Sequence, residues 1–357
     1  MSIIGQAVAQ SQVRDGHQGG IDSGNVNPLY IEQYGGEVEH RILKESFMRQ
    51  FFNFKSVRGT DTVTNDRMGH TALQKVSRGV RPTDSSPTFD NISVKVDTIV
   101  LARTNQFLLD DFLAHLDVRK EVGMEHGRTI GKFFDEAFII QGIKAAQITN
   151  QDPTGKKLGG WLGGVGGYAE IIRTAPEGFQ GATPIMLAAA NDESDSDKLV
   201  RAIQDMCQGI AEKDVELSDG VVLVRPAEYY TLLRNDKLLD RDFSGMNGDY
   251  AKGQVLQANG VRIQVTNRFP KAGDDAVTHF LSNAGNGNAY NTSADDIECI
   301  ALFLQPKALL AGETIPLTSK VYYSDIELQW FIDSYLAFGV TPNRAEMAAG
   351  IFKYKAA

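Results

Sequence analysis

The sequence predicts an α+β fold in which extended chain and helix occupy separate stretches. Residues 56–103 are rich in turns and show little helical period, whereas residues 105–146 have the pattern of helix with almost no break. Farther along, residues 197–233 have the pattern helix, buried strand, helix. A long ribbon that leads into a long helix suits a subunit that grips its neighbours better than it suits a compact enzyme.

The first hundred residues predict three different kinds of chain. Residues 1–30 are rich in Gln, Gly, Ser and Asn and poor in apolar side chains, so we expect a flexible arm. Apolar residues recur at roughly helical spacing through 31–54 and predict one or two helices with an aromatic end. Glycines and prolines then punctuate residues 55–101, where the alternation over 92–97 predicts a strand. A projecting ribbon of this kind needs another surface to lie on, because an isolated two-stranded ribbon is marginal in water.

Two helices are expected next. Thr104 and Asn105 are suited to cap a short helix over 106–116, and Asp117 to cap a longer one over 117–146. The apolar face of the longer helix is predicted to comprise Val118, Val122, Ile130, Phe133, Ala137 and Ile140. Gly123, Gly127 and Gly131 lie four residues apart on one stripe, and each costs about 1 kcal/mol relative to alanine. Two interpretations stay open: tolerated surface glycines, or a seam where another backbone approaches closely.

The rest of the chain alternates strands, helices and loops. Residues 150–195 are expected to be loop-like, and residues 159–167 alone include six glycines. A helix over 197–213, a buried strand over 221–224 and a helix opened by Pro226 follow. Asn259-Gly260 predicts a hairpin within 255–266, a strand is expected over 297–304, and the tail over 314–352 mixes strands with a short C-terminal element.

Charge and composition exclude several classes of protein. The chain has 357 residues and a net charge of −9, whereas a protein that coats nucleic acid would be basic. Residues 192–242 contain 13 acidic and 7 basic side chains, while residues 56–98 are near neutral with 6 basic and 5 acidic ones. No apolar run is long enough to span a membrane, and the N-terminus lacks the pattern of a secretory signal. Cys207 and Cys299 have no metal-type spacing and are expected to be reduced thiols.

The motifs of common active sites are missing. The glycine run 159–164 lacks the preceding strand and following helix of a dinucleotide site, and residues 154–157 lack the spacing of a phosphate-binding loop. No two histidines have a zinc-type helical spacing. The adjacent carboxylates Asp135 and Glu136 point in different directions on a helix. The sequence therefore predicts no catalytic residues, no cofactor, no metal and no enzyme activity.

Several short stretches match one known family in the same order along the chain. They are Tyr34-Gly35-Gly36-Glu37-Val38; residues 109–121 with Gly127 and Asp135; residues 197–233; Gly260-Val261-Arg262-Ile263 with Asn267 and Pro270; and residues 339–346. From about Tyr30 to Lys353 the chain resembles the major capsid protein of short-tailed, T-odd-type bacteriophages (podophages), tailed phages whose capsid protein has the Hong Kong 97-type fold. Residues 150–195 and 272–296 carry no match.

The resemblance assigns a part to each stretch of the chain. It implies a flexible N-terminal arm over 1–30, an N-terminal helical segment over 31–54 and an extended β-loop over 55–101. A peripheral domain with a long spine helix, 117–146, would cover 102–194. An axial domain would cover 195–310, and residues 311–357 would return to the peripheral domain.

The resemblance also implies a function in assembly. Hexamers and pentamers of this one chain would self-assemble into an icosahedral shell that encloses double-stranded phage DNA without binding it sequence-specifically. The implied partners are other copies of the chain, a scaffolding protein, a portal protein and a decoration protein, with no membrane. The location would be the virion, after synthesis in the host cytoplasm. An encapsulin-like or other virion structural shell protein remains an alternative, and a soluble cytoplasmic enzyme is a remote one.

The basic side chains of the extended loop are candidates for contacts between subunits. The loop is locally basic before residue 84, and its cations are suited to pair with acidic groups on an adjacent subunit; solvated loop charges are the alternative, because an exposed ion pair contributes only about 0–1 kcal/mol. Together with the glycine stripe, the candidate inter-subunit contacts are Arg58, Arg67, Lys75, Arg78, Arg81, Gly123, Gly127 and Gly131.

Overall fold

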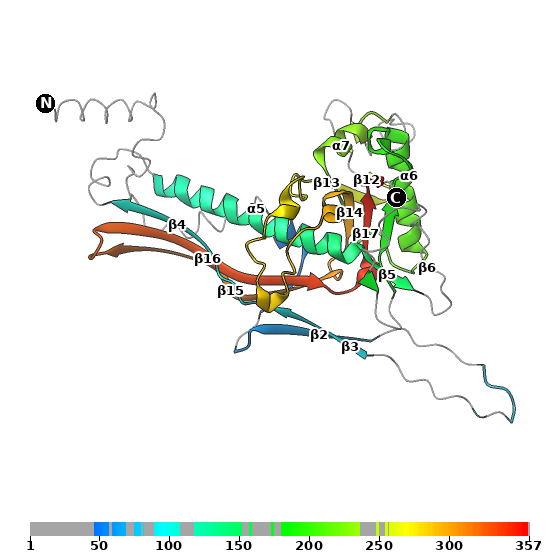
Figure 1. Ribbon diagram of the computed structural model, residues 1–357, viewed down its shortest axis with the longest axis horizontal. Helices are drawn as coiled ribbons and strands as arrows, with labels where there is room; N and C mark the ends of the chain where they lie inside the picture. The colour runs from blue at the N-terminus through cyan, green and yellow to red at the C-terminus, as the bar shows by residue number, and fades with distance from the viewer. Residues whose placement is uncertain are drawn as a thin grey trace. The chain divides into compact units, whose positions relative to one another are not determined.

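The computed structural model describes residues 46–56, 59–68, 75–79, 81, 89–107, 118–151, 157–158, 173–174, 180–235, 248–249, 254–255 and 257–355. The chain forms two compact units, and many of their elements are labelled in Figure 1. The first unit includes Thr98–Phe133 and Ile315–Ala337; the second comprises Met48–Asp97, Phe134–Thr314 and Phe338–Ala357. Three long elements run through both units: α5 (Val118–Ala146), β15 (Leu309–Ser324) and β16 (Gln329–Pro342).

In the first unit, β4 (Val100–Phe107) runs antiparallel to β16 and corrects one prediction. The helix expected over 106–116 is wrong at its start, because Gln106 and Phe107 are the last residues of this strand. The two expected capping residues bond across the unit instead. Thr104 Oγ1 lies 2.8 Å from His126 Nε2, and Asn105 Nδ2 donates to Gln329 Oε1 at 3.1 Å. Residues 108–116 lie outside the described residues.

The long helix α5 is continuous over 29 residues, which confirms the predicted helix; its expected cap, Asp117, lies outside the described residues. Ile130, Ala137 and Ile140 are buried, as the predicted apolar face requires. The prediction understates the second half of the helix. From residue 134 onward no described side chain of α5 is exposed, and that half of the helix therefore behaves as a core element of the second unit.

The second unit is built on a six-stranded mixed sheet (Figure 1). Its order is β12 (Gln257–Ala258), β13 (Val261–Val265), β9 (Val221–Val224), β14 (Cys299–Leu304), β17 (Ala348–Phe352) and β8 (Thr183–Met186). The predicted hairpin is confirmed: Asn259 and Gly260, with φ of 49° and 80°, turn the chain between β12 and β13. The strand expected over 221–224 is β9, and it pairs parallel with β13 and antiparallel with β14.

The edge strand β8 corrects the expectation of loop over 150–195. All four of its residues are buried, and it pairs parallel with β17. Pro184 weakens the local strand signal, but proline is tolerated on an edge strand, where a missing N–H breaks no pairing on the outer side. The same stretch also contributes to a three-stranded sheet of β5 (Ile148–Gln151), β6 (Lys157–Leu158) and β7 (Arg173–Thr174).

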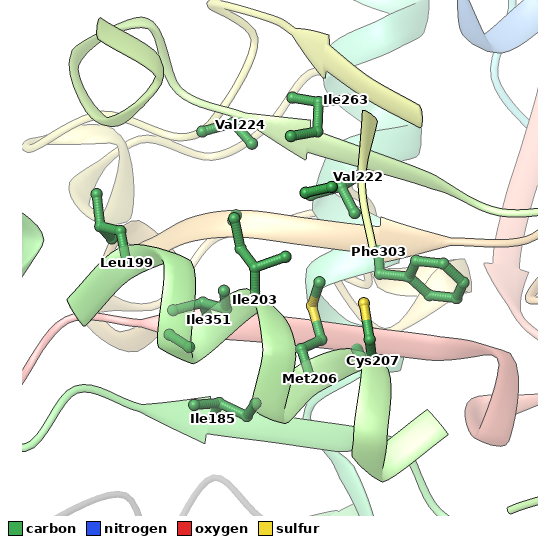
Figure 2. Packing of buried hydrophobic residues seen from close by; sticks show 14 of the residues in the cluster. Ile185, Leu199, Ile203, Met206, Cys207, Val222, Val224, Ile263, Phe303 and Ile351 are labelled. Atoms are coloured by element: carbon green, nitrogen blue, oxygen red, sulfur yellow. The ribbon is translucent and has the colours of Figure 1, made fainter. Parts of the chain in front are cut away.

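The core of this sheet lies under α6 (Ser196–Ala211), in agreement with the helix predicted over 197–213. The Asp195 side chain caps the helix by accepting hydrogen bonds from the backbone of Asp197 and Lys198. Figure 2 shows the packing of its buried side chains with those of the strands: Leu199, Ile203, Met206 and Cys207 from the helix, and Ile185, Val222, Val224, Ile263, Phe303 and Ile351 from the sheet. Each fully buried aliphatic or aromatic side chain contributes roughly 1.5–3 kcal/mol, which makes this sheet a firm platform. The helix that Pro226 opens is α7 (Pro226–Leu232).

The remaining elements place an extended ribbon. After α3 (Met48–Phe51), β1 (Phe54–Ser56) pairs parallel with β15 in a four-stranded sheet of order β1-β15-β16-β4. Next, β2 (Thr62–Met68) and β3 (Phe89–Lys95) form a two-stranded antiparallel ribbon, which confirms the strand expected near 92–97. The second unit also includes two short strands, β10 (Gly248–Asp249) and β11 (Gln254–Val255), and the helical turn α10 (Ala294–Ile297).

Candidate functional site

The ribbon β2–β3 has one face directed at its own unit. Its strands pair in register from Thr62 opposite Lys95 to Met68 opposite Phe89. Val63 and Val94 are buried and form a small apolar cluster with Leu310 of β15. At the other end, Met68 and Phe89 are exposed. The ribbon is therefore anchored at one end and presents apolar side chains to solvent at the other.

Two glycines allow the ribbon to lie directly on the strands beneath it. A Cβ atom on Gly312 of β15 would lie 2.3 Å from Cγ2 of Val63, and one on Gly339 of β16 would lie 2.9 Å from the carbonyl oxygen of Lys95. Both distances are shorter than a real Cβ contact, so a side chain at either position would displace the ribbon. Gly339 belongs to the stretch 339–346 on which the family resemblance partly rests.

Polar contacts hold the same face of the ribbon. The Arg67 guanidinium forms an ion pair with Asp90 across the ribbon, with N···O of 2.6 Å, and also donates to the carbonyl oxygen of Asn343. Asn65 Nδ2 donates to Asn343 Oδ1 at 3.1 Å, and Lys55 Nζ donates to Asn65 Oδ1 at 2.8 Å. The ribbon, β1 and Asn343, the residue after β16, therefore share one hydrogen-bonded network.

The structure divides the five basic candidates of the extended loop. Arg67 is half-buried and engaged within its own subunit, as a brace of the ribbon. Lys75, Arg78 and Arg81 are exposed, and none of them forms an ion pair with any residue that the structure describes. Between them Val76 is 64% exposed. Arg58 lies outside the described residues. The role of the exposed cations Lys75, Arg78 and Arg81 in contacts between subunits stays a prediction.

The three glycines of the stripe on α5 are buried in the chain itself. Gly123, Gly127 and Gly131 all lie on covered parts of the helix surface. The interpretation of these residues as tolerated surface glycines is therefore wrong. Their role in contacts between subunits stays a prediction.

The contacts of the loop over 279–291 are not predicted by the sequence, in which residues 272–296 carry no family match. The Tyr290 hydroxyl accepts a hydrogen bond from Val340 N at 2.7 Å and donates one to Val340 O at 3.1 Å. Asn283 Nδ2 donates to Asp97 Oδ1 at 2.8 Å, beside the base of the ribbon. The glycine and asparagine content of this loop predicts turns, and it carries no signal of these distant partners.

Cavities, metal-binding groups and reactive thiols are the features on which a chemical site would depend. A cavity of about 340 Å³ is lined by Glu136, Arg268, Lys271, Asp274 and His279 among others, and its two acidic and two basic side chains offset one another. Within the described ranges, no group of three or more metal-binding side chains comes together. Cys207 and Cys299 are free and buried, and burial raises the pKa of both thiols, which disfavours the reactive thiolate. None of the helices in the described part of the chain is long and apolar enough to cross a membrane.

Comparison with solved structures shows the Hong Kong 97-type capsid fold. A chain of the mature capsid of bacteriophage PhiM1 is 24% identical, with 86% of this chain and 87% of that chain covered and a TM-score of 0.67. The capsid of the cyanophage P-SCSP1u is 17% identical over 87% of this chain and 89% of that chain, with a TM-score of 0.69. The capsid of an empty GTA particle is 11% identical over 88% and 90%, with a TM-score of 0.54. No curated protein sequence matches.

A family model supplies the assignment that these structural likenesses cannot supply alone. The model of the Gp10A-like major capsid proteins matches residues 94–309. The match begins in the last residues of the ribbon, runs through β4 and α5 and ends at the first residue of β15. It covers more than half of the chain. The protein belongs to the Gp10A-like family of major capsid proteins, the shell-forming proteins of tailed bacteriophages.

Proposed function

We propose that this chain assembles as hexamers and pentamers into an icosahedral shell that encloses double-stranded phage DNA. The observation that carries the proposal is the family match over 94–309, which includes the long helix and most of the six-stranded sheet. Repeated use of one set of contacts in closed symmetry turns individually weak contacts into a stable shell. We further propose that the phage belongs to the short-tailed, T-odd-type group that the sequence stretches indicate, and that the chain catalyses no reaction.

Within such a shell, we propose the parts that the resemblance implies. The residues from 55 to 101 act as the extended loop, α5 as the spine helix, and the six-stranded sheet with α6 and α7 as the axial domain. That sheet draws β8 and β17 from outside 195–310, so the proposed axial domain includes strands from both sides of that range. Residues 1–30 are the proposed N-terminal arm.

The exposed cations Lys75, Arg78 and Arg81 are the proposed point at which the loop meets a neighbouring subunit. Support comes from a contrast between basic residues. Arg67 of β2 is already paired with Asp90, whereas these three residues, which lie between β2 and β3, form no ion pair with any described residue. The acidic stretch 192–242 offers carboxylates of opposite sign on another copy.

The proposed partners follow from the same function. A scaffolding protein would guide assembly, a portal protein would occupy one vertex, and a decoration protein would bind the finished shell. The net charge of −9 supports a container that encloses DNA rather than one that coats it, because phosphate neutralisation requires a basic protein. The protein would be made in the host cytoplasm and end in the virion.

Electron microscopy of the purified full-length chain tests the proposal, with and without the co-expressed scaffolding protein. We expect closed shells, or tubes of hexamers when the scaffolding protein is omitted. A chain that stays a monomer under both conditions contradicts the proposal. Closed shells that enclose host protein, and that form without the scaffolding protein, would instead indicate an encapsulin-like compartment.

A further inference from the structure

The segment 279–291, which we name the strap, is braced by its own side chains. Asn283 and Asn286 form a reciprocal cap: Asn283 Oδ1 accepts from Asn286 N at 2.9 Å, and Asn286 Oδ1 accepts from Asn283 N at 3.0 Å. Asn286 Nδ2 also donates to Leu281 O at 2.6 Å, and His279 N donates to Asn291 Oδ1 at 3.0 Å. The strap therefore keeps a defined shape although it includes only one short 3-10 turn, Ala284–Asn286.

One end of the strap is fixed to α5 and β16 by buried contacts. Lys144 Nζ donates to the carbonyl oxygens of Ala289 and Asn291 at 2.5 and 2.6 Å, and Gln141 Nε2 donates to that of Ala289 at 2.8 Å. The Tyr290 hydroxyl bonds both backbone groups of Val340. Lys144 and Tyr290 are only 6% and 4% exposed, so breaking this end would leave buried polar groups without partners.

The other end of the strap meets the root of the ribbon. Asn283 Nδ2 donates to Asp97 Oδ1, and a Cβ atom on Gly285 would lie 3.1 Å from Asp97 Oδ2 and 3.2 Å from Lys95 Nζ. At the same place the ribbon is closed by a bond from Val96 N to Asp61 O at 2.7 Å. The hydrogen bond between Asn283 and Asp97 is exposed to solvent, where such contacts are individually weak.

We propose that the strap is a releasable clamp on the root of the ribbon. Its buried end stays with α5 and β16, and its exposed end, the contact of Asn283 with Asp97, opens first. Asp97 is also the last residue of the second unit before the chain continues into the first. The clamp therefore adds to the buried contacts of Val63 and Val94 in holding the root of the ribbon, and its opening gives the root more freedom to pivot. This property belongs to the single subunit and does not depend on assembly into a shell.

Hydrogen exchange on the unassembled full-length chain tests the clamp, with the Val96 amide as reporter. Asn283→Ala removes the contact with Asp97, which is the exposed end of the clamp, and also the hydrogen bond that Asn283 Oδ1 accepts from Asn286 N. Asn286→Ala, which removes the other half of the reciprocal cap and keeps the contact with Asp97, separates the two effects. We expect exchange of Val96 and of neighbouring ribbon amides to rise about fivefold, which corresponds to about 1 kcal/mol, with no change in β9 and β14. Tyr290→Phe, which removes the hydroxyl contacts of the buried end and keeps those of Lys144 and Gln141, should raise exchange both in the ribbon root and in residues 281–291.

Ser282→Ala is the matched control, because Ser282 lies beside Asn283 and its hydroxyl has no hydrogen-bond partner among the described residues. If Asn283→Ala gives the same ribbon exchange as Ser282→Ala, the clamp does not exist. A uniform rise that includes β9 and β14 would mean general destabilisation and would also overturn the proposal. Asn283 is partly exposed, so this variant is expected to fold even if Tyr290→Phe does not.

Discussion

Val63 of the ribbon occupies the space that a side chain at Gly312 of β15 would need. A Cβ atom at position 312 would lie 2.3 Å from Val63 Cγ2, and Val94 is the next neighbour at 3.6 Å. The extended ribbon therefore rests on backbone at this point and has no layer of side chains beneath it. Substitutions at Val63 or Gly312 should therefore change the stability of the contact between the ribbon and β15.

Gly312→Ala is expected to lower the free energy of unfolding by about 1–3 kcal/mol, because the added methyl group overlaps Val63. Val63→Ala in the same chain removes the overlapping atom. The double variant should therefore lose less stability than the sum of the two single variants, as urea unfolding of all four chains would measure. Strict additivity of the two losses would show that the contact does not exist.

Arg67 lies in β2 and Arg78 in the segment between β2 and β3, and they should respond differently to the same change. Arg67→Gln removes a half-buried ion pair with Asp90 and a bond to the Asn343 carbonyl group, and we expect a loss of about 1.5–3 kcal/mol in unfolding free energy. Arg78→Gln alters an exposed side chain and should change stability by at most about 0.5 kcal/mol. Equal losses for both variants would contradict the structural role assigned to Arg67.

Charge reversal at Arg78 and Arg81 together tests the proposed contact between subunits. We expect the double change to glutamate to reduce shell yield at least about fivefold at low salt and to leave the unfolding free energy of the subunit unchanged. Lys271→Glu with Lys307→Glu is a matched control, because both side chains are exposed, both lie outside the acidic stretch 192–242, and the change in net charge is equal. Shells that form at normal yield in both low and high salt would exclude the contact.

His279 should make the second unit sensitive to acid. Its Nδ1 accepts a hydrogen bond from Leu281 N at 3.2 Å, and burial, followed by the nearby Lys144, lowers the pKa of the imidazole to about 4. The native state keeps the ring neutral, whereas the unfolded chain takes up a proton below about pH 6.5. Stability is therefore fully present above pH 6.5 and is lost as the pH falls from 6.5 toward 4, by at most about 3 kcal/mol because the ring is only partly buried.

His279→Gln should flatten that dependence, which urea unfolding at about pH 7 and about pH 4.5 would measure. The difference in unfolding free energy between the two pH values should be smaller for the variant than for the unaltered chain. An identical difference in both chains would assign the acid sensitivity to other groups, of which His126 is one, since burial lowers its pKa as well.

Much of the fold follows from local patterns in the sequence. The long helix, the segment from α6 to α7 and the hairpin at Asn259-Gly260 are each determined by residues close together in the chain, so periodicity and turn chemistry predict them. The strand β4 does not follow in this way. Its residues near Thr104 carry a capping signal, and their pairing with β16 far along the chain overrides it.

The candidate site depends almost wholly on such distant relationships. The sequence predicts a basic loop, but it cannot separate Arg67, which meets Asn343, from Arg78, which meets solvent. A glycine at position 312 is informative only when Val63 is known to lie above it. The strap likewise contains ordinary turn residues, and its role is apparent only from its hydrogen bonds to Asp97 and Val340.

The pairing of β1 and β4 with β15 and β16 has a consequence for the order in which the chain folds. During synthesis from the N-terminus, β1 emerges long before residues 311–313, its partners, and β4 long before residues 329–336. At roughly 5–20 residues per second, these early strands wait many seconds with unpaired edges. The six-stranded sheet cannot be completed sooner, because β17, the last of its strands along the chain, lies between β14 and β8. The nascent chain therefore completes both sheets only when its last fifty or so residues arrive, and until then it is exposed to association with other chains.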